Sequence, residues 1–128
     1  MALEALAREG HFFHIYDFRI RDDVAPDAFI ASFNRFDYSD DNPMHRSPAQ
    51  VKDGVLVQHV NDPRRFWLIG EWRDIEEHAR IRKVLADSIR PEFIAMIEGG
   101  RFVPEYGRIV SATPQSVLDR AGSSADSK

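Results

Sequence analysis

His14 and Tyr16 are the residues of this chain whose types and spacing best suit proton transfer to or from a small molecule. Residues two apart in a strand project from one face, so both side chains would line the same pocket. A histidine titrates near neutrality, and it can take a proton from a phenol or an enol to leave a carbanion that reacts with oxygen. The alternative is that both residues belong to the core and have satisfied polar tips.

Trp72 and His78 form a second candidate group, at the point where a predicted strand meets a predicted helix. An indole at the strand end can stack on a planar ligand and donate one hydrogen bond, although packing alone would also explain it. His78 shares a helical side with Ile81 and Leu85, which would aim it inward. It is therefore either a second base or an interior histidine.

His45 and Arg46 lie in the polar, turn-rich stretch 38–47. There they could cover a pocket and hold an acidic group of a substrate. Exposure on a loop without a function is the alternative. We interpret both residues as candidate substrate contacts.

The spacing of the five histidines argues against a dedicated metal site. They include neither an i, i+4 pair nor a His-x-His pair, and His11 and His14 would lie on opposite faces of a strand. Haem binding would need an axial histidine in a large apolar cavity, and His78 is the helical candidate for that role.

Composition limits the class of protein. With 128 residues, 43% of them hydrophobic, we expect one domain with a real core. The absence of cysteine excludes disulfides, thiolate nucleophiles and cysteine-ligated metal centres. The net charge of -4 argues against nucleic acid as a partner. We find neither an apolar run near the ~20 residues of a membrane span nor a secretory leader, so we expect no membrane association and a cytoplasmic location.

Hydrophobic periodicity and turn signals predict the elements that must position these residues. Asp74 and Glu77 predict a capping box at the start of the second main helix. In the first half of the chain we predict a short amphipathic helix over 1–9, a strand over 12–20, and a helix from Pro26 with an apolar stripe of Phe29, Ile30, Phe33 and Phe36. A helical turn over 49–53, ended by Gly54, then precedes strands over 55–60 and 66–72 that are joined as a hairpin. The second half contains a helix from Ile75 with Ile81, Val84, Leu85 and Ser88 inward, a short helix after Pro91 with Phe93, Ile94 and Ile97, and a strand over 105–112.

This order of elements predicts an α+β fold, the ferredoxin-like βαββαβ antiparallel sheet with helices on one face. The uncovered face would carry Phe13 and Ile15 with either Trp67 and Ile69 or Phe66 and Leu68. An exposed apolar face of this kind predicts a homodimer. We divide the chain into an N-terminal extension, residues 1–10, a domain, residues 11–112, and a polar, frayed tail, residues 113–128.

The chain resembles the dimeric α/β-barrel superfamily and, within it, the antibiotic biosynthesis monooxygenase-like proteins. Gly54 before a strand, the Asp62-Pro63 turn, Phe66 in an aromatic strand and Trp72 before a helix match the pattern of that family. Two positions depart from it. Gly70 stands where the family usually has a strand glutamate, with Glu71 shifted by one, and Ile81 stands in place of the usual helix histidine, with His78 one turn earlier.

The resemblance implies a cofactor-independent monooxygenase that acts on an aromatic or enolisable small molecule and dimerises into an α/β barrel. In that hypothesis His14 or His78 removes a proton, Tyr16 and Trp72 orient the ring, and neither a cofactor nor a metal takes part. The displaced glutamate and histidine favour a competing hypothesis, a non-catalytic small-ligand binder or structural dimer. Because the superfamily includes haem-degrading enzymes, haem binding or degradation is a third.

Overall fold

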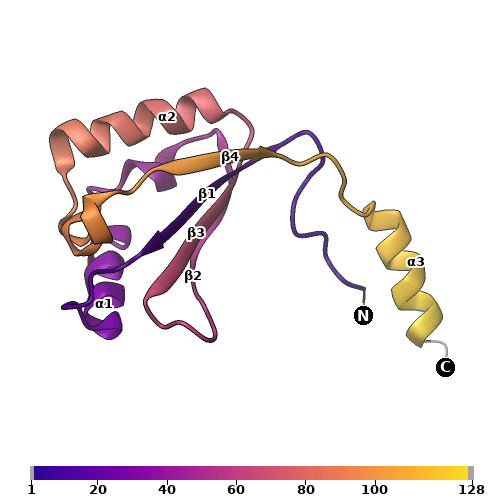
Figure 1. Cartoon of the computed structure of the whole chain (residues 1–128). Helices are drawn as coiled ribbons and strands as arrows, with labels where there is room; N and C mark the ends of the chain where they lie inside the picture. The colour runs from indigo at the N-terminus through magenta and orange to yellow at the C-terminus, as the bar shows by residue number, and fades with distance from the viewer. Residues whose placement is uncertain (1, 127–128) are drawn as a thin grey trace.

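The computed structural model describes residues 2–126 and contains a four-stranded antiparallel sheet of strand order β2-β3-β1-β4 (Figure 1). The predicted ferredoxin-like α+β fold is confirmed. The elements are β1 (Phe12–Arg19), α1 (Pro26–Asp37), β2 (Gln50–Gln58), β3 (Arg65–Trp72), α2 (Ile75–Val84), β4 (Pro104–Arg108) and α3 (Gln115–Asp126). Short 3-10 turns lie at Pro43–Arg46, Glu92–Met96 and Glu98–Gly100.

Helices α1 and α2 cover the same face of the sheet. Phe29 of α1 lies against Phe18 of β1 and Phe66 of β3, with ring centroids 5.6 and 5.0 Å apart. This phenylalanine cluster is the apolar core, and the predicted stripe on α1 supplies one side of it. Around α2 the same sheet face is lined instead by polar aromatic side chains. The core therefore has one half made of apolar side chains and one half that contains histidine and tyrosine.

Register decides which residues the uncovered face carries. Ile15 pairs with Ile69 and Asp17 with Trp67, so Trp67 and Ile69 share the open face with Phe13 and Ile15. Val55 and Val57 of β2 pair with Ile69 and Trp67 and extend that face. Both valines are exposed. The face therefore has an apolar centre, with Asp17 and Glu105 among the charged residues that share it.

The segment 49–53 was predicted as a helical turn, and this was wrong. β2 already begins at Gln50 and reaches Val55 through two register irregularities, with Gly54 inside the strand. A Cβ atom at Gly54 would lie 3.2 Å from the carbonyl oxygen of Ile69. The glycine therefore permits a close backbone approach inside the sheet rather than ending a helix.

The inward face of α2 was predicted correctly only in its first turns. Ile81 is buried, but Val84 and Ser88 are exposed. After Val84 the chain forms a single π-helical turn, Leu85–Ile89, which changes the angular phase of the residues that follow. At the start of α2, Asp74 caps the helix by accepting from the amide of Glu76, whereas Glu77 bonds Arg80 rather than reaching back.

The two ends of the chain also differ from their predicted structure. Described residues 2–9 form no helix, in keeping with the marginal stability of so short a segment. The tail contains α3, and Gln115 of α3 bonds the amide of Ala5 and the carbonyl of Leu3, so the two ends lie side by side (Figure 1). Met1 and residues 127–128 lie outside the described residues. β4 ends at Arg108 instead of Ala112.

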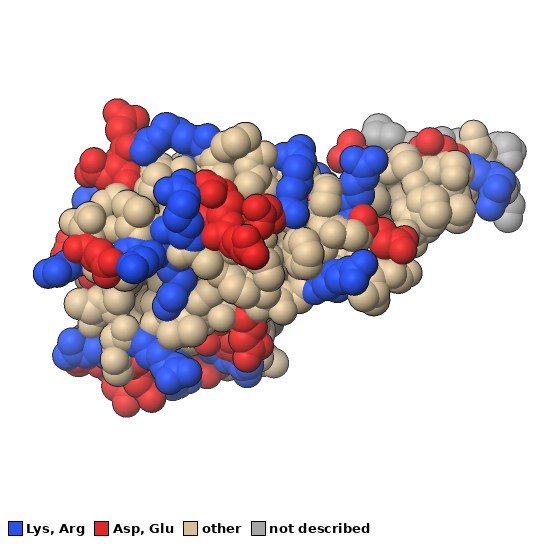
Figure 2. Space-filling view, turned by 90° about the horizontal axis from the view of Figure 1, so that it is seen from above, with Lys and Arg blue, Asp and Glu red and all other residues tan. Residues whose placement is uncertain are grey.

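No helix in residues 2–126 combines the length and apolar character that crossing a membrane requires. The face shown in Figure 2 carries Lys and Arg interspersed with Asp and Glu rather than a patch of one sign. That distribution does not favour a nucleic-acid backbone as a partner on this face.

Candidate functional site

Four of the six residues predicted to form a site meet between the sheet and α2. The ring centroids of His14 and His78 lie 4.6 Å apart, and Trp72 and Tyr16 lie 4.9 and 6.0 Å from His78. All four side chains are buried. Residues from β1, β3 and α2 that are up to 64 positions apart, His14 and His78 being the extremes, thus build one aromatic cluster.

His14 is held by the indole of Trp72. The indole Nε1–H donates to His14 Nδ1 at 2.8 Å. The other ring nitrogen, Nε2, is buried and has no hydrogen-bond partner among residues 2–126. Burial, and secondarily the nearby His78, lowers the pKa of His14 to about 3, so the ring is neutral at physiological pH.

Gly70 makes the position of the His14 ring possible. It pairs with His14 across β1 and β3, and a Cβ atom there would lie 2.6 Å from His14 Cε1. Any larger residue would collide with the imidazole. The resembled family usually has a strand glutamate at this position. Glycine stands here instead because the His14 ring occupies the space that a side chain would need.

His78 lies between two tyrosine hydroxyls. Its Nδ1 is 2.8 Å from Tyr106 Oη, and its Nε2 is 3.4 Å from Tyr16 Oη. Burial, and secondarily the charge of Arg82, lowers the pKa of His78 to about 4. Burial raises the pKa of both Tyr16 and Tyr106, and in each case Arg82 opposes it. All three groups are neutral near pH 7 and can pass a proton along the chain Tyr16, His78, Tyr106.

Sequence reasoning did not identify Tyr106 as a site residue. It lies in the predicted last strand, but its role depends on β4 pairing with β1, which sets Tyr106 opposite His14. Tyr106 is 38% exposed, whereas Tyr16 is 3% exposed. The row of hydroxyl and imidazole groups therefore leads from the buried site toward solvent.

A cavity of about 60 Å³ adjoins the cluster. Its lining is mainly apolar, with polar groups supplied by the cluster and by the segment after α1. The lining residues are His14, Tyr16, Phe33, Phe36, Asp37, Asn42, Met44, His45, Gln50, Asp53, Gly54, Leu68, His78, Leu85, Phe93 and Phe102. Trp72 is not among them, so its contact with the site runs through His14.

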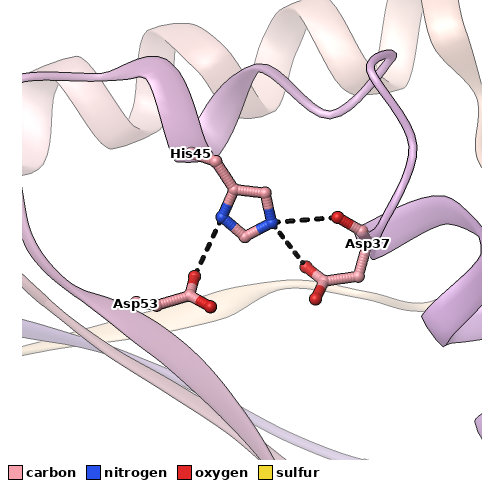
Figure 3. Close-up of side chains that lie close together, drawn as sticks. All are labelled: Asp37, His45 and Asp53. Carbon is pink, nitrogen blue, oxygen red and sulfur yellow. Dashed lines mark hydrogen bonds and ion pairs between the residues drawn. The ribbon is translucent and has the colours of Figure 1, made fainter.

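Residues 38–47 form one wall of the cavity and are fastened by His45. Its Nε2 lies 2.9 Å from the backbone carbonyl of Asp37, and its Nδ1 lies 2.9 Å from a carboxylate oxygen of Asp53 (Figure 3). The carbonyl accepts only, so Nε2 must carry hydrogen, and the carboxylate favours hydrogen on Nδ1 as well. We call Asp37, His45 and Asp53 the clasp.

The pKa of His45 is raised. Burial alone would lower it, but the hydrogen bond to the Asp37 backbone and the charges of Asp53 and Asp37 outweigh that effect. Each ring nitrogen faces a different aspartate (Figure 3). This is the geometry of an imidazolium with two acceptors.

Arg46 does not line the cavity. Its guanidinium donates to the backbone carbonyl of Asp40 at 2.8 Å, on the exposed side of the segment. The predicted contact of Arg46 with an acidic substrate group therefore has no counterpart in this arrangement, whereas His45 does reach the cavity wall.

Glu71, the shifted strand glutamate, lies on the opposite face of the sheet from the cluster. It is 3% exposed and accepts from the Arg8 amide and from His11 Nδ1, both at 2.8 Å. The N-terminal segment thus covers Glu71 at one end of the open face. Glu71 belongs to this packing and not to the cavity.

Comparison with known proteins finds the same fold in solved structures. A dimeric ferredoxin-like protein from an uncultured marine organism matches with a TM-score of 0.60 at 15% identity over 80% of this chain and 90% of that one. A proposed antibiotic biosynthesis monooxygenase from Bordetella bronchiseptica matches with a TM-score of 0.57 at 13% identity, over 80% and 100% of the two chains. SnoaB, a cofactor-independent oxygenase from Streptomyces nogalater, matches with a TM-score of 0.53 at 18% identity, over 80% and 93%.

No protein-family model matches the chain, and no curated protein matches it in sequence. The structural neighbours include proteins of the group that the sequence resembles. At 13% to 18% identity this similarity establishes the architecture: the chain has the ferredoxin-like α+β fold of these proteins.

Proposed function

We propose that the protein is a homodimeric, cofactor-independent monooxygenase that acts on a small aromatic or enolisable molecule bound in the cavity. The observation that carries the proposal is the neutral His14–His78 pair at the cavity wall, joined through His78 to two tyrosine hydroxyls. Such an array can remove a proton from a ligand in a site with little water, where the resulting carbanion reacts with oxygen.

The contacts favour His78 over His14 as the base. His14 Nδ1 is occupied by the Trp72 indole, whereas His78 can accept a proton through the Tyr16 hydroxyl that lines the same cavity. With a pKa of about 4, His78 is unprotonated at neutral pH and therefore available. A negative charge developing on the ligand raises the proton affinity of His78 as the reaction proceeds.

The chemical step balances with oxygen as the oxidant. An enolisable CH₂ carbon loses a proton, the carbanion and oxygen form a C–O bond, and protonation gives a hydroperoxide. Loss of water then leaves a carbonyl at that carbon. His78 returns the abstracted proton to the peroxide, and Tyr106 connects His78 toward solvent for proton exchange.

The residues do not fit haem. Both nitrogens of His78 contact tyrosine hydroxyls, and the cavity of about 60 Å³ is far below the roughly 300–1,000 Å³ of pockets for drug-sized ligands. We derive no step through haem.

Dimerisation is supported by the open apolar face that includes Ile15, Trp67 and Ile69, and by the dimeric ferredoxin-like neighbour. A non-catalytic small-ligand binder is the second candidate function. One observation favours it: the strand glutamate is withdrawn from the cavity and held by His11. Substrate turnover separates the two candidates.

The test is oxygen uptake with a panel of cyclic 1,3-diketones and naphthols in chelator-treated buffer, with products identified by mass spectrometry. We expect turnover by the wild type and a loss of about 10²-fold or more in His78→Gln, the scale of general base catalysis. Tyr106→Phe should lower turnover, whereas Tyr38→Phe, which removes an exposed hydroxyl, should not. Ligand binding without oxygen uptake by the wild type would instead establish the binder.

A further inference from the structure

We infer that Trp72 holds His14 in the tautomer that carries its proton on Nε2, and that this N–H selects a ligand with a hydrogen-bond acceptor. The acceptor is a carbonyl, enolate or phenolate oxygen directed at His14. The inference deepens the proposed function, on which it rests for the place of the ligand, and it names the chemical class that the cavity takes.

The tautomer follows from the chemistry of the donor. An indole N–H only donates, so His14 Nδ1, 2.8 Å from Trp72 Nε1, must present its lone pair. A neutral imidazole carries a single proton, which then has to be on Nε2. With a pKa lowered to about 3, chiefly by burial, the ring is neutral over the whole physiological range.

The unpartnered N–H is buried, and it belongs to a side chain that lines the cavity. His14 is 5% exposed, lines the cavity, and its Nε2 has no hydrogen-bond partner within residues 2–126. A Cβ atom at Gly70 would lie 3.1 Å from Nε2, and one at Gly54 would lie 3.8 Å from it. Two glycines thus keep side chains away from this nitrogen. A buried donor left without a partner is costly, so an acceptor that reaches Nε2 gains affinity.

This assignment of the His14 tautomer gives the two histidines different roles. His14 has no free lone pair, because Nδ1 accepts from the indole and Nε2 carries the proton. It therefore neither removes a proton nor binds a metal through Nε2. It acts as a fixed donor that stabilises negative charge on the ligand oxygen, while His78, whose nitrogens contact Tyr16 and Tyr106, acts as the base through the Tyr16 hydroxyl.

The rest of the cavity sets the shape of the ligand. Phe33, Phe93 and Phe102 are among the lining residues, and they favour an apolar ring. The matching ligand is a small ring compound with one oxygen acceptor directed at the sheet. Cyclohexanone and methylenecyclohexane form a matched probe pair, because they have nearly the same shape and differ in an acceptor oxygen.

The first arm of the test is a long-range ¹H–¹⁵N spectrum of the histidine rings in the full-length protein. We expect His14 to show a protonated Nε2 and an unprotonated Nδ1 between pH 5 and pH 8. Trp72→Phe, which removes the indole donor but keeps an aromatic ring, should mix the two tautomers. The signals of His59, which lies outside the cluster, serve as an internal control. A proton on Nδ1 of His14 in the wild type would overturn the inference.

The second arm compares the affinities of the two probes. We expect cyclohexanone to bind the wild type about two- to tenfold more tightly than methylenecyclohexane, the effect of one neutral hydrogen bond, and to shift the His14 Nε2–H signal. His14→Leu, with its fold checked by its amide spectrum, should abolish this preference. Equal affinity of the two probes, or binding of neither, would overturn the ligand assignment. Both arms are independent of oxygen uptake, so a protein that selects the ketone without turnover would sustain this inference while refuting the monooxygenase.

Discussion

The His14–Gly70 pair shows how two residues can fix a site across a sheet. His14 on β1 needs space that only the residue opposite it on β3 can leave, and Gly70 leaves it. The same pairing lets Trp72, two residues further along β3, reach Nδ1 of His14. Strand periodicity places Gly70 and Trp72 on one face, so a single exchange at Gly70 affects both the ring and its hydrogen bond.

Gly70→Ala should lower the free energy of unfolding by about 1–3 kcal/mol, the usual cost of overpacking a core. The new methyl would lie 2.6 Å from His14 Cε1 and push the ring away from Trp72. Denaturant unfolding followed by tryptophan fluorescence measures the change. Gly107→Ala is the matched control, because a Cβ atom there meets only Ile15 Cδ1 at an ordinary 3.7 Å. Equal stability of the two variants would contradict this account of the site.

Among the elements, the segment between α1 and β2 lines the cavity, although its sequence gives only a weak signal for its structure. Its 3-10 turn, Pro43–Arg46, is capped by Asn42, whose side chain accepts from the Met44 amide. His45 then joins this turn to the end of α1 through Asp37 and to the irregular start of β2 through Asp53. Because all three elements contribute residues to the cavity lining, the clasp holds this part of its wall in place.

The clasp should loosen as pH rises. A group whose pKa is raised by folding contributes its stabilisation fully below its unfolded pKa of about 6.5, and loses it as pH rises through the folded value. Hydrogen exchange of residues 38–47, corrected for intrinsic rates, should therefore be slower at pH 6 than at pH 9. His45→Gln should exchange faster and with little dependence on pH.

The control for the clasp is Arg46→Gln. Arg46 lies in the same turn but bonds only the Asp40 carbonyl on the exposed side, so its replacement should keep the wild-type pH response. Protection of the segment in His45→Gln that equals the wild type at pH 6 would refute the clasp. Burial raises the pKa of Asp37, and its protonation on the acid side would weaken the same contact, so the comparison is made at pH 6 and above.

Local sequence patterns correctly predicted the features that depend on residues close together in the chain. The strand of His14 and Tyr16, the phenylalanine stripe of α1, and Asp74 as the cap of α2 follow from periodicity and capping chemistry. The element order then predicted the sheet topology. The segment 49–53 was misread because Gly54 stops a helix and permits close strand approach equally well, and sequence alone does not distinguish these uses.

The site was predictable only in part, because its contacts are not local. Strand parity predicted that His14 and Tyr16 share a face, and helical spacing aimed His78 inward. Tyr106 and the clasp depend on which strands pair and on how an irregular loop folds back. The tautomer of His14 depends on a 2.8 Å contact that no spacing rule provides.

At the scale of the whole molecule, the open face of the sheet exposes apolar side chains to water, which is unfavourable. Phe13, Ile15, Trp67 and Ile69 form its centre. The guanidinium of Arg65 lies 5.1 Å from the centre of the Trp67 ring and borders the apolar area. At the other end the N-terminal segment covers Glu71 and so protects one edge of the face. An apolar area of this extent is better satisfied by a second copy packed face to face.

Ile69→Lys should convert a dimer into a monomer, because it places an unpaired charge at the centre of a buried apolar interface, at a cost of several kcal/mol. Val60→Lys adds the same charge at a residue that is 95% exposed, beyond the end of β2, and should leave the dimer intact. Native mass spectrometry and light scattering at about 10 µM, a concentration far above the Kd of a stable dimer, measure the subunit count. A wild type that is monomeric under these conditions, or an Ile69→Lys variant that dimerises as the wild type does, would show that something other than a second copy satisfies this face. Because the cavity lies on the opposite side of the sheet, the monomeric variant should still select cyclohexanone over methylenecyclohexane, which separates assembly from ligand recognition in a single protein.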